Sequence, residues 1–488
     1  MKSTTPFLPG ISPKYEGRSR RCQLDVIRKF RDKLLSKSIS DLGVLFAEIL
    51  PPELLSQAGK EIRRRVFPED ITFWAWVSQL LEGNSSCANA LTLIQGWYSD
   101  ADLPVPSFDT SSYCRARRRL SDEFLNVVAS RTKEYAQTRV EPHHLWYGHR
   151  LKAIDGTTVK LMDTVKNQAE FPQPSGQKPG CGFPVMGIVG VLDLATGRLE
   201  DYVIAKGRDH DAKGLYRLCG QFNPGDIVIA DRAFCGYELI AKLLGNDVHS
   251  VMRLHQMREK KLDWRKGKKL DPDSRLVTWS KPPKPGKSGI TEREWKALPE
   301  TMQVRLVRTR GIGRDGKPRT MYLVTTLLEA NEYPTDEIGM LYAERWKIEV
   351  KFRDIKTTMK VEMFRVQSPA MARKMMRMVQ LAYNLIKAIQ MEAIRGEAVL
   401  IDELGFKGSM DVLNEFRSRF RGLQTKPRKA REKRIEFECR VLERILRIRP
   451  NRREPRAVKT RPKPYQYLSA PRREFIEIQH RSNYRSVA

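Results

Sequence analysis

At the start of the chain, apolar residues recur at the spacing of amphipathic helices. The clearest case is IRRRVFPEDITFWAWVSQLLEG, residues 62–83, in which Asp70 is the predicted N-cap. Trp74 and Trp76 of this segment are expected to lie in a hydrophobic core rather than in a ligand site. A second helix is predicted through Tyr113–Leu120. The first part of the chain is therefore expected to be helical.

From residue 150 the pattern changes to short apolar runs rich in β-branched residues and separated by turn-like segments. The runs predict strands within residues 150–163, 183–194, 197–207, 226–245 and 247–255, and the fourth run continues through a turn into a helix. A β-hairpin around GIGRDGKP is predicted within 303–330. This order of elements predicts an α/β fold with a mixed sheet covered by helices.

Two long helices are predicted after the hairpin. The first covers residues 335–360, with Thr335 as its expected N-cap, and the second covers 368–394. Methionines form a stripe along the second helix, and they are interpreted as core filling.

The chain has 488 residues, a length typical of about three domains. Its pattern divides it into a helical N-terminal domain at 1–145, an α/β domain at 146–400 and a basic C-terminal region at 401–488. The C-terminal region is expected to be helical at first. Its second half is rich in proline and is expected to be extended.

The charge balance indicates a polyanionic partner. The chain has 89 Lys and Arg against 58 Asp and Glu, a formal net charge of +31. Nucleic acid is the first candidate and an acidic membrane surface the second. Positive charge is concentrated in residues 258–319 and 417–485. A single charged run is often only a solvated surface, but two runs of one sign favour contact with nucleic acid.

The helix predicted through Tyr113–Leu120 is also basic. It carries Arg115 and Arg118, together with Arg117 and Arg119, on or near one surface. This surface is expected to lie against DNA phosphates or in a DNA groove. The alternative is a solvated basic helix.

Several classes of protein are excluded by what the sequence lacks. It has no apolar run long enough for a membrane span and no signal-peptide pattern at its start. Its seven cysteines are scattered without a CxxC pair, which argues against structural zinc and against a disulfide framework. It also lacks the GxxxxGK[ST] phosphate loop, so no nucleotide cofactor is expected. A cytoplasmic protein with reduced thiols is predicted.

Three carboxylates are candidates for a metal site. Asp155 and Asp231 each follow an apolar strand-like run, KAID and DIVIAD. Ligands collect at the carboxyl ends of strands in open α/β sheets, so both side chains can point into one cleft. A third carboxylate on a covering helix would complete an all-oxygen site suited to Mg²⁺. Either aspartate alone could equally begin a turn.

The third carboxylate is Glu349, and it belongs to a larger pattern. Tyr342, Arg345, Glu349 and Lys356 are spaced by 3, 4 and 7 residues. At about 100° per residue on a helix, all four share one face. Phenol, guanidinium, carboxylate and ammonium groups together suit a place where phosphate meets metal. The alternative is an exposed helix with ordinary salt bridges.

The pattern Y-x2-R-x3-E-x6-K resembles the signature of bacterial insertion-sequence transposases of the insertion element four family, in the DDE superfamily. IDGTTVKLMD around Asp155 and ADRAFCGYELI around Asp231 fit this resemblance, which covers roughly residues 40–400. It implies an RNase H-like core in which Asp155, Asp231 and Glu349 are catalytic and hold two Mg²⁺ ions, with Mn²⁺ as a possible substitute. Tyr342, Arg345 and Lys356 would contact DNA.

The resemblance also implies a β-rich insertion between Asp231 and Glu349, here at about 255–333. In relatives, an aromatic residue of this insertion stacks on a flipped base. One of Trp264, Trp279 and Trp295 is the candidate, and the alternative for each is packing within the insertion.

The activity implied by the resemblance is cut-and-paste transposition. The enzyme would cut the terminal inverted repeats of its element, pass through a DNA hairpin and join the ends to target DNA by two-metal phosphoryl transfer. A homodimer holding two DNA ends, associated with the bacterial nucleoid, is expected. The alternatives are a metal-dependent nuclease without strand transfer and a non-catalytic DNA-binding regulator.

Overall fold

The computed structural model describes residues 39–59, 66–100, 104–205, 216–284, 290–312, 318–420, 423, 426–446, 468 and 470–475. The segment RDHDAKG at 208–214, which is interpreted from the sequence as a helix cap or a DNA-facing loop, lies outside these residues. So does most of the proline-rich end of the basic C-terminal region.

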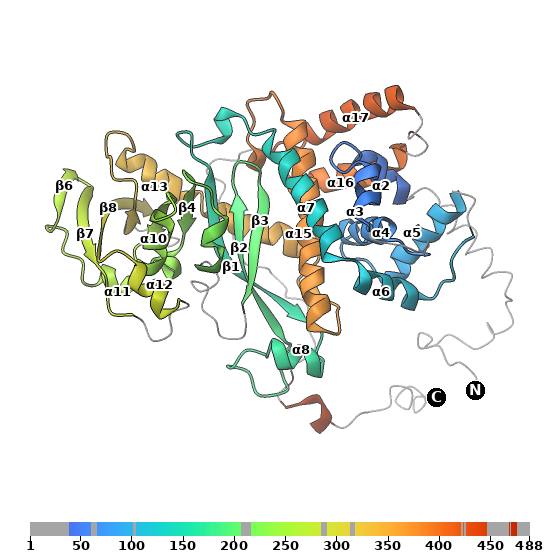
Figure 1. The fold of residues 1–488 in the computed structure, drawn as a ribbon, viewed down its shortest axis with the longest axis horizontal. Helices are drawn as coiled ribbons and strands as arrows, with labels where there is room; N and C mark the ends of the chain where they lie inside the picture. Colours follow the sequence, from blue (N-terminus) through green and yellow to red (C-terminus); the bar gives the residue numbers. More distant parts are fainter. Residues whose placement is uncertain are drawn as a thin grey trace, which may run out of the picture.

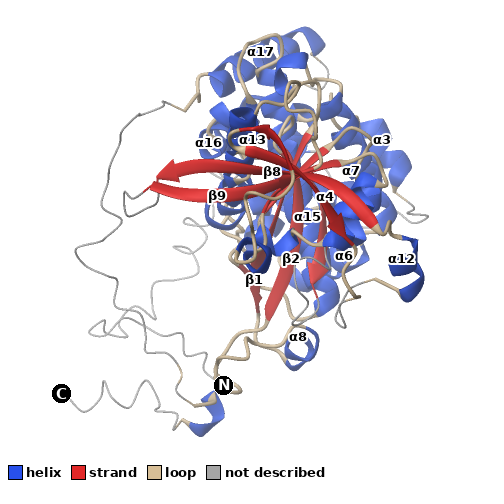
Figure 2. Cartoon of the chain, turned by 90° about the vertical axis from the view of Figure 1, so that its left-hand side faces the viewer, coloured by secondary structure: helices blue, strands red, loops and turns tan. Residues whose placement is uncertain are grey.

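A ten-stranded mixed sheet forms the centre of the molecule, and Figure 2 shows it as one twisted layer with helices packed around it. Its first five strands lie in the order β3-β2-β1-β4-β5. Only β2 runs against the other four, because β1, β4 and β5 pair in parallel and β3 is antiparallel to β2. This is the RNase H-like arrangement, so the predicted fold class is confirmed. The five strands are Leu151–Leu161 (β1), Val185–Asp193 (β2), Arg198–Ala205 (β3), Ile227–Ala230 (β4) and His249–Arg253 (β5).

The sheet continues past β5 into the predicted insertion. The β8–β9 pair is antiparallel, as the predicted hairpin requires, and β9 pairs with β5. The tip of this hairpin, at 313–317, lies outside the described residues. The strands added to the sheet here are Lys268–Asp271 (β6), Ser274–Ser280 (β7), Thr301–Ile312 (β8) and Pro318–Thr325 (β9), while Met363–Phe364 (β10) pairs with the end of β1.

Short helices connect and cover the strands of the sheet. They are Val165–Glu170 (α8), Tyr237–Leu244 (α10), Gln256–Glu259 (α11) and Glu292–Ala297 (α12), with 3-10 turns at Pro142–His144, Cys219–Gln221 and Arg232–Phe234.

Helices make up the described residues before the sheet, as the sequence predicts. In α4 the predicted N-cap is wrong, because Pro68 occupies that position and Asp70 lies inside the first turn. Glu69, the first residue of α4, instead accepts a hydrogen bond from the backbone of Ser121, which joins α4 to the start of α7. Trp74 and Trp76 are buried in the core. These helices are Ile39–Leu45 (α2), Pro52–Ala58 (α3), Glu69–Leu81 (α4), Cys87–Asp100 (α5), Thr110–Arg119 (α6) and Asp122–Gln137 (α7).

The long helix α15, Pro369–Ala393, lies between the sheet and the N-terminal helices (Figure 1). It is buried along most of its length, and Met375, Met376 and Met378 are core residues as predicted. Asn384 and Gln380 hydrogen-bond the backbone of β3 at Leu199, at distances of 3.0 Å. These bonds satisfy backbone groups of an edge strand, which would otherwise offer pairing sites to another chain.

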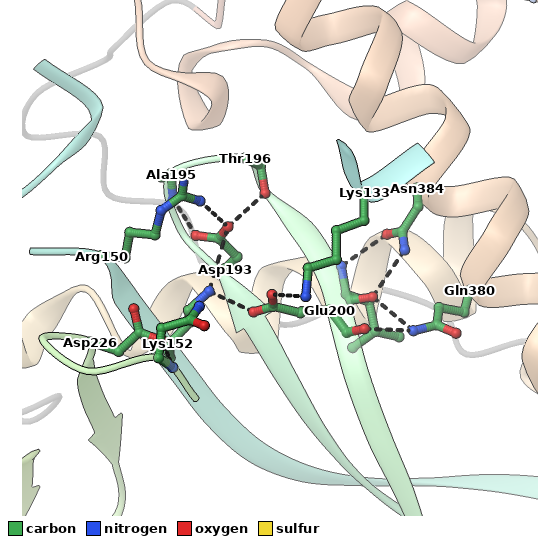
Figure 3. A network of polar contacts seen from close by, with 12 residues as sticks. Lys133, Arg150, Lys152, Asp193, Ala195, Thr196, Glu200, Asp226, Gln380 and Asn384 are labelled. Carbon is green, nitrogen blue, oxygen red and sulfur yellow. Dashed lines mark hydrogen bonds and ion pairs between the residues drawn. The ribbon is translucent and has the colours of Figure 1, made fainter. Parts of the chain in front are cut away.

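Figure 3 shows a buried ionic network at the beginning of β1. The ammonium group of Lys152 donates to Glu200 at 2.5 Å and lies 3.6 Å from Asp193. Asp193 also accepts hydrogen bonds from Arg150 at 3.2 Å and from the hydroxyl of Thr196 at 3.1 Å. Because each buried charge has partners, the network ties β1, β2 and β3 together at the end of the sheet away from Asp155.

The C-terminal helices are Phe406–Phe416 (α16) and Pro427–Leu442 (α17), preceded by a 3-10 turn at Ile401–Glu403 and joined by another at Arg417–Phe420. A last 3-10 turn covers Arg472–Glu474. Phe416, Phe420 and Phe437 pack their rings together and fix α17 on the core.

None of the helices in the described part of the chain combines the length and apolar character that a membrane crossing needs. The six cysteines of that part are free, and Cys22 lies outside it.

Candidate active site and nucleic-acid interface

Asp155 and Asp231 lie side by side where two parallel strands separate. Ile154 and Ala230 are the last paired residues of β1 and β4, and each is followed directly by an aspartate. One detail of the prediction is wrong: Asp155 does not end its strand, because β1 continues to Leu161 through pairing with β2. The run GTTVKL is rich in β-branched residues, which explains why the strand persists.

The predicted helix at 335–360 is divided into three parts. Helix α13, Thr335–Ala343, stops at Glu344, and α14, Trp346–Arg353, begins after Arg345. Residues Asp354–Thr358 then form a π-helical turn that contains Lys356.

The expected N-cap of this helix, Thr335, does not cap it, because Pro334 holds that position. The hydroxyl of Thr335 instead donates to Asp271 at 2.6 Å and accepts from Arg305 at 2.7 Å. These contacts attach the beginning of α13 to the insertion strands.

The signature side chains meet the two aspartates. The hydroxyl of Tyr342 donates to Asp231 Oδ1 at 3.3 Å. The guanidinium of Arg345 donates from Nη1 to Asp155 Oδ2 at 3.2 Å and from Nη2 to Glu349 Oε1 at 2.8 Å. Asp155 and Asp231, which are far apart in sequence, therefore form one cluster with the phenol, guanidinium and carboxylate of the signature segment. Because these contacts reach beyond the helix, the alternative of an exposed helix with only local salt bridges is wrong.

The three carboxylates are close enough to shift the pKa values of groups in the cluster. Burial is the main cause that raises the pKa of Asp155, and the negative charges of Glu349 and Asp231 raise it further, against the lowering effects of the Gly156 backbone and Arg345. Burial and the neighbouring Asp231 raise the pKa of Tyr342 to about 12, so the phenol is a hydrogen-bond donor at neutral pH. One arginine does not neutralise three carboxylates, and the remaining negative charge favours cations.

Asp155, Asp231 and Glu349 offer only oxygen donors, the type that Mg²⁺ prefers. Within the described residues, no three His, Cys, Asp or Glu side chains already converge as closely as metal ligands do. Arg345 gives the physical reason here, since its guanidinium joins Asp155 to Glu349. The donor chemistry fits divalent cations, provided that Arg345 releases the two carboxylates.

A hollow of about 740 Å³ opens beside the carboxylates and contains both Asp155 and Glu349 in its wall. Lys356, predicted from the signature, lies on this wall, and burial lowers its pKa. Sequence reasoning missed three other wall residues: Lys160, Phe183 and Arg353. The only signal for Lys160 and Arg353 was their position near signature residues, and nothing in the loop around Phe183 indicated a role.

The basic helix α6 exposes Arg115 and Arg118 to solvent, together with Arg119. The expectation that Arg117 shares this surface is wrong, because its guanidinium packs over Trp76 at 3.9 Å and donates to the sulfur of Cys87. Burial of the arginine carbon chain and the cation–π contact favour the inward position. A second hollow, of about 450 Å³, lies beside this helix and is lined by Val66, Phe67, Pro106, Ser107, Ser112, Arg115 and Arg119.

The three candidate tryptophans pack within the insertion. Trp279 and Trp295 are 9% and 6% exposed, respectively. Trp264 is partly buried against Tyr322, with Arg308 4.9 Å from its ring. All three are absent from the wall of the hollow beside the carboxylates. In this conformation the structure brings none of them to Asp155, Asp231 or Glu349.

Comparisons with known proteins show what this chain is similar to. Residues 146–385 match the family described as Transposase DDE domain. The chain is 25% identical over 467 residues to the Transposase InsG for insertion sequence element IS4 of Escherichia coli (strain K12), covering 92% of this chain and 98% of that protein. Among solved structures, a piggyBac transposase synaptic complex with hairpin DNA aligns at a TM-score of 0.41 with 13% identity, covering 82% of this chain and 85% of that one.

Proposed function

The chain belongs to the DDE transposases of insertion sequences, and from this premise we propose that it cuts the two ends of its own element and joins them to target DNA. The observation that carries the proposal is the cluster in which Tyr342 and Arg345 contact Asp155, Asp231 and Glu349. Acidic groups for metal and basic groups for phosphate meet at one point, as strand cleavage and joining require.

In this proposal Asp155, Asp231 and Glu349 hold two Mg²⁺ ions, for which Mn²⁺ can substitute. When bound, such a pair activates the attacking oxygen and stabilises the leaving oxygen of an in-line displacement. Arg345 exchanges its carboxylate partners for a DNA phosphate, to which a guanidinium can donate two parallel hydrogen bonds. Tyr342 holds Asp231 in place through its hydroxyl, and Lys356 lies in the hollow where the DNA backbone would pass.

The same site is proposed to act several times, because each reaction is the same displacement at phosphorus. Cleavage of the transferred strand leaves a 3′ hydroxyl, which attacks the opposite strand and closes a hairpin. Water reopens the hairpin, and the freed 3′ hydroxyl attacks target DNA. We propose a homodimer holding two element ends, which sedimentation with end DNA would test.

The rest of the chain is assigned to DNA contact on the basis of its charge. Arg115 and Arg118 of α6 are proposed to contact the phosphates of the terminal repeats, within an N-terminal DNA-binding domain at 1–145. The protein is proposed to work in the cytoplasm on the nucleoid, where its partners lie. The structure contains no observation that favours Trp264, Trp279 or Trp295 as the stacking residue.

An excision assay tests the proposal. A marker is placed between the natural boundaries of the element, and the protein is supplied in trans as wild type, Asp155→Asn, Asp231→Asn or Glu349→Ala. Asp163→Asn is the matched control, because Asp163 is an exposed aspartate just beyond the end of β1. We expect marker loss and reinsertion with wild type and the control only.

Each alternative function predicts a different outcome of this assay. Cutting without reinsertion would replace the proposal with a nuclease. End binding without cutting, in Mg²⁺ or Mn²⁺, would replace it with a regulator. Cutting retained in any of the three carboxylate variants would refute the metal assignment.

A further inference from the structure

Three cations line the hollow beside the carboxylates, and Glu362 on the same wall is an acidic neighbour whose charge acts on Lys356. Lys160, at the end of β1, and Arg353, at the end of α14, are exposed, and Lys356 is half-buried. Among the described residues, none of these three side chains makes an ion pair or a side-chain hydrogen bond. By contrast, the buried cations Lys152 and Lys351 are each paired with a carboxylate. Unpaired cations around a concave site indicate an anionic ligand.

Phe183 lies on the same wall, and its side chain is unusually open for an aromatic residue. It is 47% exposed, although most phenylalanines of the chain are in the core. A ring that is left open to water next to cations and catalytic carboxylates is available for stacking on a ligand.

The backbone on both sides of Phe183 is held in place. Gly182 donates its N–H to Gln173 at 3.1 Å, and its carbonyl accepts from the side chain of Gln168 at 2.9 Å. On the other side, the carbonyl of Pro184 accepts from the backbone of Leu161 at 2.9 Å, which ties the loop to the end of β1. The ring is therefore presented by a braced loop, and binding a ligand costs little ordering of the backbone.

We propose that Phe183, Lys160 and Arg353 form a nucleotide subsite in which an unpaired base next to the scissile phosphate stacks on the Phe183 ring. Lys160 and Arg353 contact the phosphates on either side of that nucleotide. The subsite rests on the proposed transposase function and specifies how the DNA end is held. It also places the stacking residue in the loop before β2 instead of in the insertion.

The size of the hollow favours an unpaired nucleotide over intact duplex. Its volume of about 740 Å³ is that of a small-ligand pocket. The hollow can hold one nucleotide, so we place in it a base that has left the stack, beside the strand that reaches Asp155 and Glu349. Taking a base out of the stack costs a few kcal/mol, which a new aromatic stack offsets in part.

The test compares Phe183→Leu, which removes the ring but keeps an apolar side chain, with Phe183→Tyr, which keeps the ring. Both are made in the Glu349→Ala full-length chain, so that DNA is bound but not cut. The probe is end DNA whose last nucleotides are unpaired, with either a normal base or an abasic site at the position next to the cleavage point. Binding is measured by fluorescence anisotropy.

We expect Phe183→Leu to weaken binding of the normal probe by about 5- to 150-fold, the range for one base–aromatic stack. Phe183→Tyr should bind like the parent, and the abasic probe should bind equally to all three proteins. A reverse-charge pair, Lys160→Glu and Arg353→Glu, should weaken both probes and reduce the salt dependence of binding.

Equal affinity of Phe183→Leu and the parent for the normal probe would overturn the subsite, and so would an equal loss on both probes. Thermal unfolding of Phe183→Leu shows whether it is folded. If it is not folded, the parent protein alone provides the test. Weaker binding of the abasic probe than of the normal probe supports stacking, and equal binding refutes it. Failure of the wild-type chain to cut end DNA would instead refute the proposed function, so the two failures are distinct.

Discussion

Gly190 is expected to control the position of Glu349, although it lies on a different element and touches no substrate. It pairs with Asp155 across β1 and β2, and the ring of Phe352 on α14 packs directly over it. A Cβ added at Gly190 would lie 2.9 Å from Phe352 Cζ and 3.0 Å from Leu199 Cδ1. Gly190→Ala therefore requires the Phe352 ring to shift, and we expect α14 and Glu349 to move with it.

The expected change in the free energy of unfolding of Gly190→Ala follows from two opposed effects. Inserting a methyl group into a packed core costs about 1–3 kcal/mol. Replacing a strand glycine by alanine returns about 0.5–1 kcal/mol through backbone entropy. The crowding is larger, so we expect a net loss of about 1 kcal/mol in the free energy of unfolding. Activity should suffer more, because a displacement near 1 Å can cost about 10²-fold in rate.

The assay measures urea unfolding and end cleavage for Gly190→Ala, Phe352→Leu and the double variant. Phe352→Leu makes room for the added methyl group, so the double variant should be more stable than additivity predicts by about 0.5–3 kcal/mol. Its cleavage should exceed that of Gly190→Ala.

Gly187→Ala is the matched control for crowding in β2. Its Cβ would lie 3.1 Å from Ala205 on β3, away from α14, so it should lose stability without a comparable loss of cleavage. The reasoning is refuted if Gly190→Ala cleaves like wild type. Strict additivity in the double variant would refute it equally.

Three further predictions concern other parts of the molecule. Burial opposes the charge of Asp402, but the charges of Lys351, Lys347 and Lys387 outweigh burial and lower its pKa to about 2. Its contribution to stability should be complete above pH 3.8 and be lost as the pH falls toward 2. Asp402→Asn should cost about 3–5 kcal/mol at pH 7 in urea unfolding, because it removes the carboxylate that pairs with the buried Lys351. Burial raises the pKa of Glu438 to about 7, so the folded state favours its protonated form. The free energy of unfolding should therefore fall as the pH rises from 4.5 to 7. Glu438→Gln should raise the melting temperature relative to wild type at pH 8, and by a smaller amount at pH 5. Arg115→Ala with Arg118→Ala should lower the log–log salt slope of end binding by about 0.9 for each lost phosphate contact, whereas an unchanged slope would remove α6 from the DNA interface.

The sequence predicts most of the sheet because each strand is a short apolar run between turn residues. It also predicts that Asp155 and Asp231 can point into one cleft, because each follows a strand-like run, and the family resemblance of the signature adds Glu349 to them. It does not predict which arginine of a basic helix turns inward: Arg117 is buried by Trp76, a contact between residues 41 positions apart. Phe183 is missed for a similar reason, since its exposure depends on a loop braced by side-chain hydrogen bonds that no local pattern encodes.

The break in the signature helix cannot be predicted from local helix propensity. LYAERWKIEVKF contains no proline or glycine to stop a helix, and its residues are good helix formers. The α-helical pattern nevertheless fails at Arg345 and again at Lys356, where the π-helical turn lies. Single π turns are frequent at functional sites, and both irregularities fall on basic signature residues. A straight helix would line up all four side chains. The observed path lets Arg345 join Asp155 to Glu349 and lets Lys356 face the hollow where we place the DNA strand. Tertiary contacts with the sheet, rather than local propensity, therefore set the geometry of the site.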